Sequence, residues 1–237
     1  MEITRNGIIL NKIKYGDNAI ICNVYTNEQG KQSYLINSSI YKKNKTIYLN
    51  PLQIIEFEIN YKNGKKLQAI KSTSHTYVYK NLPFNVYKSS IAVFISQLLN
   101  YVIQEEAPNK ELYEYIKQSV IFLDNTSESI ANFHLFFMIN LSRFLGYYPN
   151  DNYSESNCYF NLKQAQFTDI RSDNTTGPNV GRVIHKLLNT KVSTLNELKL
   201  DHSSRNTILN TLLHFFELHN DKRFNIKSLE VIREIFS

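Results

Sequence analysis

The hydrophobic residues of this chain change their spacing once, near residue 83, and this change constrains the fold more than any other feature. Before it, apolar residues alternate with polar ones in short runs, and turn residues interrupt these runs about every ten positions. A period of two is typical of strands that bury one face, and such turn spacing is typical of a small antiparallel barrel or sandwich. We expect five strands, at residues 3–10, 19–26, 31–36, 52–61 and 67–77.

The connection between the third and fourth runs, residues 37–50, is much longer than the other connections. Five strands with a long connection at this position predict an OB-like barrel. We therefore assign an N-terminal five-stranded OB-fold domain to residues 1–80.

After Pro83 the apolar residues recur at helical spacing. The pattern predicts helices at about 86–104, 111–123 and 128–145, and the third is apolar nearly all round, as expected of the buried centre of a bundle. Residues 149–178 form an irregular insertion with a short hairpin at 159–162 and 166–168. Helices resume at about 179–189, 203–219 and 227–236. The fold class is mixed α+β, with an all-helical domain over residues 81–237.

The excess of positive over negative charge lies in the first third of the chain. Residues 1–80 hold twelve Lys or Arg against five Asp or Glu, a net charge of +7, whereas the remainder has a net charge of −1. A basic face of this kind usually meets a polyanion, and nucleic acid is the leading candidate.

Cys22 and Cys158 are far apart in the sequence, which indicates a reducing interior, and no apolar run has the length of a membrane span. We expect a cytoplasmic protein without membrane association.

Signatures of catalysis are missing from the sequence. It has no phosphate-binding Gly-rich loop, no Gly-x-Ser-x-Gly and no His-Glu-x-x-His, and its six histidines lack metal-ligand spacing. We therefore expect no enzyme, no cofactor and no metal. A magnesium-dependent nuclease that uses scattered carboxylates such as Asp151, Asp169 and Asp173 is a remote alternative.

The most concentrated basic segment lies in the long connection of the barrel. Lys42, Lys43 and Lys45 lie between Tyr41 and Tyr48, so ammonium groups could neutralise phosphates while rings offer a stacking face. The alternative is a solvated loop on a protein-docking module whose lysines only keep a sheet edge soluble. Further basic residues on the same domain favour DNA binding: Arg5, Lys12, Lys14, Lys31, Lys62, Lys65, Lys66 and Lys71.

Four short motifs, in order along the chain, resemble the bacterial recombination mediator family RecO. The first is Tyr15-Gly16-Asp17-Asn18 followed by Val24 to Lys31, which resembles the family's turn and hairpin in its OB-fold. The others are the helix junction at 105–112, the Leu-Gly-Tyr-Tyr-Pro segment at 145–149, and His219 followed by Lys-Ser-Leu at 227–229. Together they cover nearly the whole chain.

The resemblance implies a non-enzymatic role in recombinational DNA repair, in the cytoplasm and associated with the nucleoid. Proteins of this family bind single- and double-stranded DNA, anneal complementary strands, and help to load the RecA recombinase with RecR and single-strand-binding protein. In this family the acidic tail of single-strand-binding protein docks on the helical domain, so the resemblance implies an apolar pocket with a basic rim. The candidate rim residues here are Lys117, Arg143, Arg182 and Lys186.

One departure from the family pattern concerns zinc. Many members carry two Cys-x-x-Cys pairs after the Leu-Gly-Tyr motif, whereas this segment holds only Cys158. A four-thiolate zinc site therefore cannot form, and we expect the hairpin at 159–168 to take its place by ordinary backbone pairing.

Overall fold

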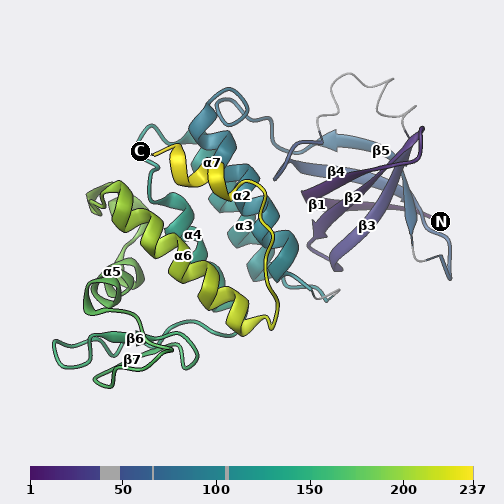
Figure 1. The fold of residues 1–237 in the computed structure, drawn as a ribbon. Coiled ribbons are helices and arrows are strands. Elements are labelled where there is room, and N and C mark those ends of the chain that lie inside the picture. The colour runs from purple at the N-terminus through teal and green to yellow at the C-terminus, as the bar shows by residue number, and fades with distance from the viewer. Residues whose placement is uncertain (38–48, 66, 105–106, 237) are drawn as a thin grey trace. The chain divides into compact units, whose positions relative to one another are not determined.

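The computed structural model describes residues 1–37, 49–65, 67–104 and 107–236 (Figure 1). Its contacts divide the chain into two units, Met1–Asn125 and Thr126–Ser237. The first unit contains the strands β1 (Glu2–Tyr15), β2 (Ala19–Thr26), β3 (Gly30–Asn37), β4 (Ile54–Asn60) and β5 (Gln68–His75), and the helices α2 (Val86–Val102) and α3 (Lys110–Asn125). The predicted domain boundary at residue 80 stays a prediction.

The five strands close into a barrel in the order β1-β2-β3-β5-β4. All neighbours pair antiparallel except β3 and β5, whose short parallel contact runs from Tyr34–Gln68 to Ile36–Ile70. The predicted OB-like barrel and mixed α+β class are thus confirmed. The expected first strand is too short, because β1 pairs with β2 as far as Tyr15 opposite Ala19 and so forms a long hairpin.

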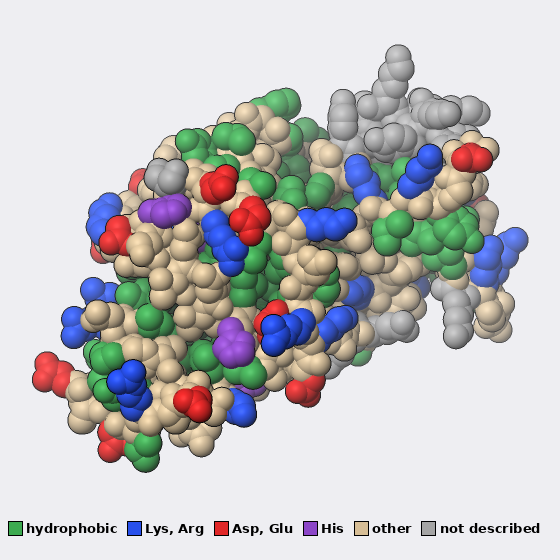
Figure 2. Space-filling model, viewed as in Figure 1, with side chains coloured by type: hydrophobic (Ala, Val, Ile, Leu, Met, Phe, Trp, Pro, Cys, Tyr) green, Lys and Arg blue, Asp and Glu red, His purple; other side chains and the backbone are tan. Residues whose placement is uncertain are grey.

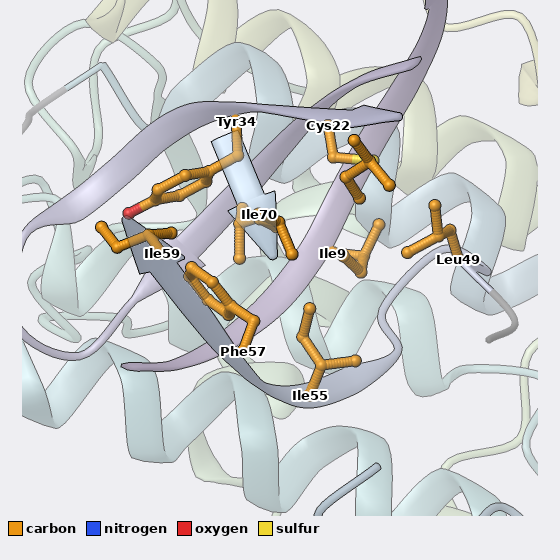
Figure 3. Packing of buried hydrophobic residues seen from close by; sticks show 10 residues of the cluster. Ile9, Cys22, Tyr34, Leu49, Ile55, Phe57, Ile59 and Ile70 are labelled. Atoms are coloured by element: carbon orange, nitrogen blue, oxygen red, sulfur yellow. The ribbon is translucent and has the colours of Figure 1, made fainter. Parts of the chain in front are cut away.

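Alternating side chains of the strands fill the barrel. Ile9 on β1, Tyr34 on β3, and Phe57 and Ile59 on β4 are each at most 2% exposed and point toward one another (Figure 3). The rings of Tyr34 and Phe57 meet edge to face at 4.8 Å. Gly7 lies in this packed region, where an added Cβ would come within 2.4 Å of Val24 Cγ1. The odd-numbered residues of this part of β1 therefore face the interior, as a period of two requires.

Helix α2 packs on β1 and is tied to the barrel by polar contacts. Asn85 caps its first turn, accepting hydrogen bonds from the backbone N–H groups of Tyr87 and Lys88 at 3.0 and 3.1 Å. The Ser96 hydroxyl donates to the carbonyl of Leu10, and Asn23 donates to the side chain of Asn100 at 3.1 Å. These contacts join the barrel and α2 in one unit.

Asp124, at the end of α3, organises the connection between β5 and α2. Its carboxylate is fully buried and accepts hydrogen bonds from the Tyr77 hydroxyl at 3.0 Å and from the backbone N–H groups of residues 80, 81 and 82 at 3.0, 2.8 and 2.6 Å. Burial opposes the charged form, but these hydrogen bonds outweigh it and lower the pKa of Asp124. The connection is therefore held by an ionised carboxylate.

The second unit consists of short helices and one hairpin. Its elements are α4 (Phe133–Phe144), β6 (Tyr159–Asn161), β7 (Gln166–Thr168), α5 (Pro178–Asn189), the 3-10 helix η1 (Val192–Glu197), α6 (His202–His219) and α7 (Leu229–Glu234). The hairpin and the last helices are confirmed near their predicted positions, and η1 was missed. Helix α4 begins five residues later than predicted.

Helix α4 contacts α5, η1 and α6, in agreement with its apolar sequence. It ends at Phe144, Leu145 is its C-cap residue, and Gly146 follows with a φ of 84°. The Tyr147 N–H donates to the Ser142 carbonyl at 3.2 Å, which is the backbone bond of a Schellman motif. Gly146 therefore terminates α4 in the left-handed conformation that glycine adopts without strain.

A buried arginine holds the C-terminal segment of this unit. Arg205 on α6 is 8% exposed and donates from Nε to Asn132 Oδ1 at 3.1 Å, from Nη1 to the Phe236 carbonyl at 2.8 Å and from Nη2 to the Leu200 carbonyl at 2.8 Å. Burial lowers its pKa, and the nearby charge of Asp201 opposes that shift. Three of its nitrogens thus have acceptors inside the unit.

Helix α5 approaches β6 so closely that one position requires glycine. A Cβ added to Gly181 would lie 2.0 Å from the carbonyl oxygen of Cys158, a backbone atom that cannot swing away. We expect Gly181→Ala to destabilise the second unit by about 2 kcal/mol through overpacking, measured by urea unfolding. Gly177→Ala is the matched control, because nothing lies within 4 Å of its added Cβ. Equal stability of the two variants would contradict this packing.

Candidate nucleic-acid interface

Two exposed lysines lie on the long β1–β2 hairpin. Lys12 and Lys14 pair by backbone with Cys22 and Ile20. Cys22 belongs to the barrel core and Ile20 packs against it, and side chains directly opposite each other on neighbouring strands share a face. Because the register shifts between Ile9 and Asn11, the even-numbered Lys12 and Lys14 lie on the face that continues the barrel interior. Neither forms an ion pair with any residue that the structure describes.

A second exposed pair, Lys62 and Lys65, lies in the turn between β4 and β5. The buried side chain of Gln68 holds this turn, accepting from the Lys62 N–H at 3.0 Å and donating to the Lys62 carbonyl at 2.9 Å. Within the described ranges these two lysines also have no acidic partner. The turn therefore presents positive charge from a well-held backbone.

Two other predicted cations are engaged within the unit. Lys31 on β3 donates from Nζ to the carbonyls of Asn100 and Ile103, the latter at 3.0 Å, at the C-terminal end of α2. An ammonium there satisfies carbonyls that the helix leaves without partners and complements the helix dipole. Lys71 forms an exposed ion pair with Glu2. The structure thus gives Lys31 a role in holding α2, which its position in the sequence did not indicate.

Arg5 differs most from its expected position on a surface. It is 8% exposed, and its backbone pairs with Phe57, a residue of the barrel core. Four further predicted residues, Lys42, Lys43, Lys45 and Lys66, lie outside the described part of the chain. Among the described residues, the candidate interface therefore consists of Lys12, Lys14, Lys62 and Lys65.

An apolar row on the opposite face of the β1–β2 hairpin was missed by the sequence analysis. Ile13 is 54% and Tyr15 is 58% exposed. Ile13 lies opposite Ile21, which lies opposite Leu35 on β3. Figure 2 shows hydrophobic side chains grouped on the barrel with Lys and Arg side chains around them. The Lys-Ile-Lys-Tyr alternation at residues 12–15 was the available signal.

Other kinds of site find little support in the described residues. No group of three or more His, Cys, Asp or Glu side chains there could hold a metal ion. Asp151, one of the carboxylates considered for a nuclease, accepts from His185 Nδ1 and Asn189 Nδ2, both at 2.6 Å, if the imidazole is protonated at Nδ1. Across the same described ranges, every helix is too short or too polar to cross a membrane.

Comparison with known proteins assigns both parts of the chain. Residues 1–79 match the family model for the N terminus of recombination protein O, and residues 84–230 match the model for its C terminus. The chain belongs to the RecO family. A member from Phocaeicola vulgatus, named DNA repair protein RecO, is 34% identical over 98% of both chains. Members of that name from Bacteroides fragilis and Flavobacterium psychrophilum are 34% identical over 97% and 29% identical over 100% of both chains.

The RecO resemblance also supplied four candidate residues for a partner site, and the structure separates them. Lys117 on α3 belongs to the first unit and pairs with Glu114 at 3.3 Å. In the second unit, the Arg143 guanidinium lies 4.4 Å from the centre of the Tyr148 ring. Arg182 and Lys186 are exposed and lie one turn apart on α5. Only this last pair shares a helix face.

Proposed function

We propose that this RecO-family DNA repair protein is a DNA-binding recombination mediator that binds single- and double-stranded DNA through its barrel. The main support is the set of four exposed lysines, Lys12, Lys14, Lys62 and Lys65, which have no acidic partner among the described residues. Lysines of this kind neutralise backbone phosphates and release counterions without reading sequence.

The same chemistry suits strand annealing. Two complementary strands repel each other through their phosphates, and a basic surface that binds both weakly lowers this repulsion while it leaves the base edges free to pair. We further propose that RecR and single-strand-binding protein are the partners and that the complex helps to load RecA on single-stranded gaps. Arg182 and Lys186 on α5 are the pair we favour for the acidic tail of single-strand-binding protein, because they share a face.

A labelled single-stranded oligonucleotide, titrated across a salt series, tests DNA binding. If both lysines of a pair contact phosphates, Lys12→Ala/Lys14→Ala and Lys62→Ala/Lys65→Ala each lose about 1.4 from the slope of log affinity against log salt. Relative to 1 M salt, this corresponds to a loss in affinity of about 25-fold at 0.1 M salt. The double variant Lys163→Ala/Lys227→Ala, which removes two exposed lysines of the second unit, is the control and retains the wild-type slope.

An unchanged slope in both barrel variants would refute the proposed interface at these lysines. It would favour the second candidate function, a barrel that docks a protein, and the exposed apolar row of Ile13 and Tyr15 supports that candidate. In that case Ile13→Ser/Tyr15→Ser should weaken binding to RecR and leave the affinity for DNA unchanged.

A further inference from the structure

Arg5 is a charged side chain in the packed interior of the barrel. It occupies the same face of β1 as Gly7 and Ile9, and its backbone lies opposite Phe57. An arginine so placed is held by its neighbours, so its guanidinium is ordered before any ligand arrives. The exposed lysines of the barrel lack this preorganisation.

The guanidinium of Arg5 has no protein counter-charge among the described residues. Its Nε is buried without a hydrogen-bond partner, and no carboxylate of the described chain pairs with it. The two Nη nitrogens are not among the buried unpartnered atoms, and 8% of the residue reaches solvent. A buried charge without compensation costs several kcal/mol. A ligand from solvent can reach the Nη atoms.

A second unpartnered donor belongs to the same part of the core, because the ring of Tyr34 lies 4.8 Å from that of Phe57, the residue opposite Arg5. The hydroxyl of Tyr34 is buried without a hydrogen-bond partner, and the residue is 2% exposed. Burial raises the pKa of Tyr34 to about 12, while the charge of Arg5 acts in the opposite direction. The hydroxyl therefore stays protonated at neutral pH. Arg5 Nε and the Tyr34 hydroxyl are thus two buried donors without partners, and the charge of Arg5 is close enough to act on Tyr34.

We propose that Arg5 and Tyr34 form an oxyanion site of the barrel that binds a phosphate group. A planar guanidinium matches the oxygens of a phosphate and binds them by paired, charge-assisted hydrogen bonds. Water alone could satisfy the two donors but would leave the charge of Arg5 uncompensated. The phosphate comes either from free inorganic phosphate or from the backbone of a DNA strand, and the second source rests on the proposed function.

Glu28, in the turn after β2, is the acidic residue whose charge acts on Tyr34. Its charge raises the pKa of Tyr34, but it is exposed and forms no ion pair with Arg5. A carboxylate in this position repels a bound anion, so Glu28→Gln should tighten phosphate binding. If Glu28 were instead the counter-charge of Arg5 in solution, Glu28→Gln would lower the Tm and leave phosphate without effect.

Thermal unfolding in 0.1–20 mM phosphate, with ionic strength held constant by sodium chloride, tests the site. Once phosphate exceeds its Kd tenfold, the Tm of the wild type should rise by about 3–6 °C and then increase only slowly. Arg5→Met and Tyr34→Phe should lose most of this rise, and Arg5→Met should melt no lower than the wild type in chloride alone, because an unpaired buried charge is gone. Equal rises in all three proteins would show general exclusion of phosphate from the surface and overturn the site.

The same variants, titrated with the labelled oligonucleotide in chloride buffer, distinguish the two sources of phosphate. A weaker affinity and shallower salt slope in Arg5→Met and Tyr34→Phe would place a DNA phosphate at the site. Unchanged DNA binding with a lost phosphate response would assign the site to free phosphate. If both the phosphate response and the DNA affinity are unchanged in these variants, the inference is overturned. The lysine variants would still test the proposed function independently.

Discussion

Replacing Asp124 by alanine is expected to destabilise the first unit by about 4 kcal/mol. The substitution leaves the partly buried Tyr77 hydroxyl and three backbone N–H groups without their acceptor, and hydrogen bonds to a charged group contribute more than neutral ones. Asp124→Asn keeps the size and one acceptor oxygen but turns an amide toward these donors, so we expect a loss of about 2 kcal/mol. Urea unfolding followed by circular dichroism at pH 7 measures both values.

Asp17→Asn is the matched control for Asp124, because Asp17 is exposed in the turn after β1 of the same unit. We expect its free energy of unfolding to match the wild type. Since the folded pKa of Asp124 is lowered, its contribution is present above the unfolded pKa and disappears as the pH falls through the folded value. Asp124→Ala as stable as Asp17→Asn would show that the β5–α2 connection is held by something else.

The second large effect concerns His134 in acid. His134 on α4 is fully buried and stacks on Phe236 with ring centres 6.1 Å apart. Burial, and then the positive charge of Arg205, lower its pKa from 6.5 to about 3. Between these two values the unfolded chain binds a proton that the folded chain excludes, so stability falls as the pH falls. The full difference corresponds to about 5 kcal/mol, and about 2.7 kcal/mol is lost by pH 4.5.

His134→Phe should remove this pH dependence and retain the ring stacking. Unfolding free energies of variant and wild type, measured between pH 7.5 and 4.5, isolate His134, because all other titrating groups are common to both. The advantage of the variant should grow steadily below pH 6.5. His202→Gln, which changes an exposed histidine at the start of α6, is the matched control. A constant difference between His134→Phe and wild type would mean that His134 protonates as readily folded as unfolded.

The fold was predictable where local patterns and tertiary packing agree. Period-two runs separated by turn residues led to the five barrel strands, because a strand with one buried face must alternate. The extension of β1 to Tyr15 was missed because both faces of the hairpin carry exposed residues there, so the pattern lacks a buried stripe. The 3-10 helix η1 buries only Leu195, which is too weak a signal for sequence periodicity.

The candidate site was less predictable, because exposure and pairing are tertiary properties. A count of lysines and arginines treats Arg5, Lys12 and Lys31 as equivalent. In the structure Arg5 faces the barrel interior, Lys12 is exposed, and Lys31 donates to the end of α2. The partner of Lys31 lies about 70 residues away in the sequence, where no local motif can indicate it.

The sequence by itself determined the class of this protein: an OB-like barrel followed by helices, a positive charge concentrated on the barrel, and motifs of the RecO family in the correct order. These features depend on periodicity and composition, which are local. Only the tertiary structure decided which cations are available to a ligand, that Asp124 binds the β5–α2 connection, and that Arg5 and Tyr34 are both buried. Burial and hydrogen-bond partners decide these roles, and both arise only when distant segments pack together.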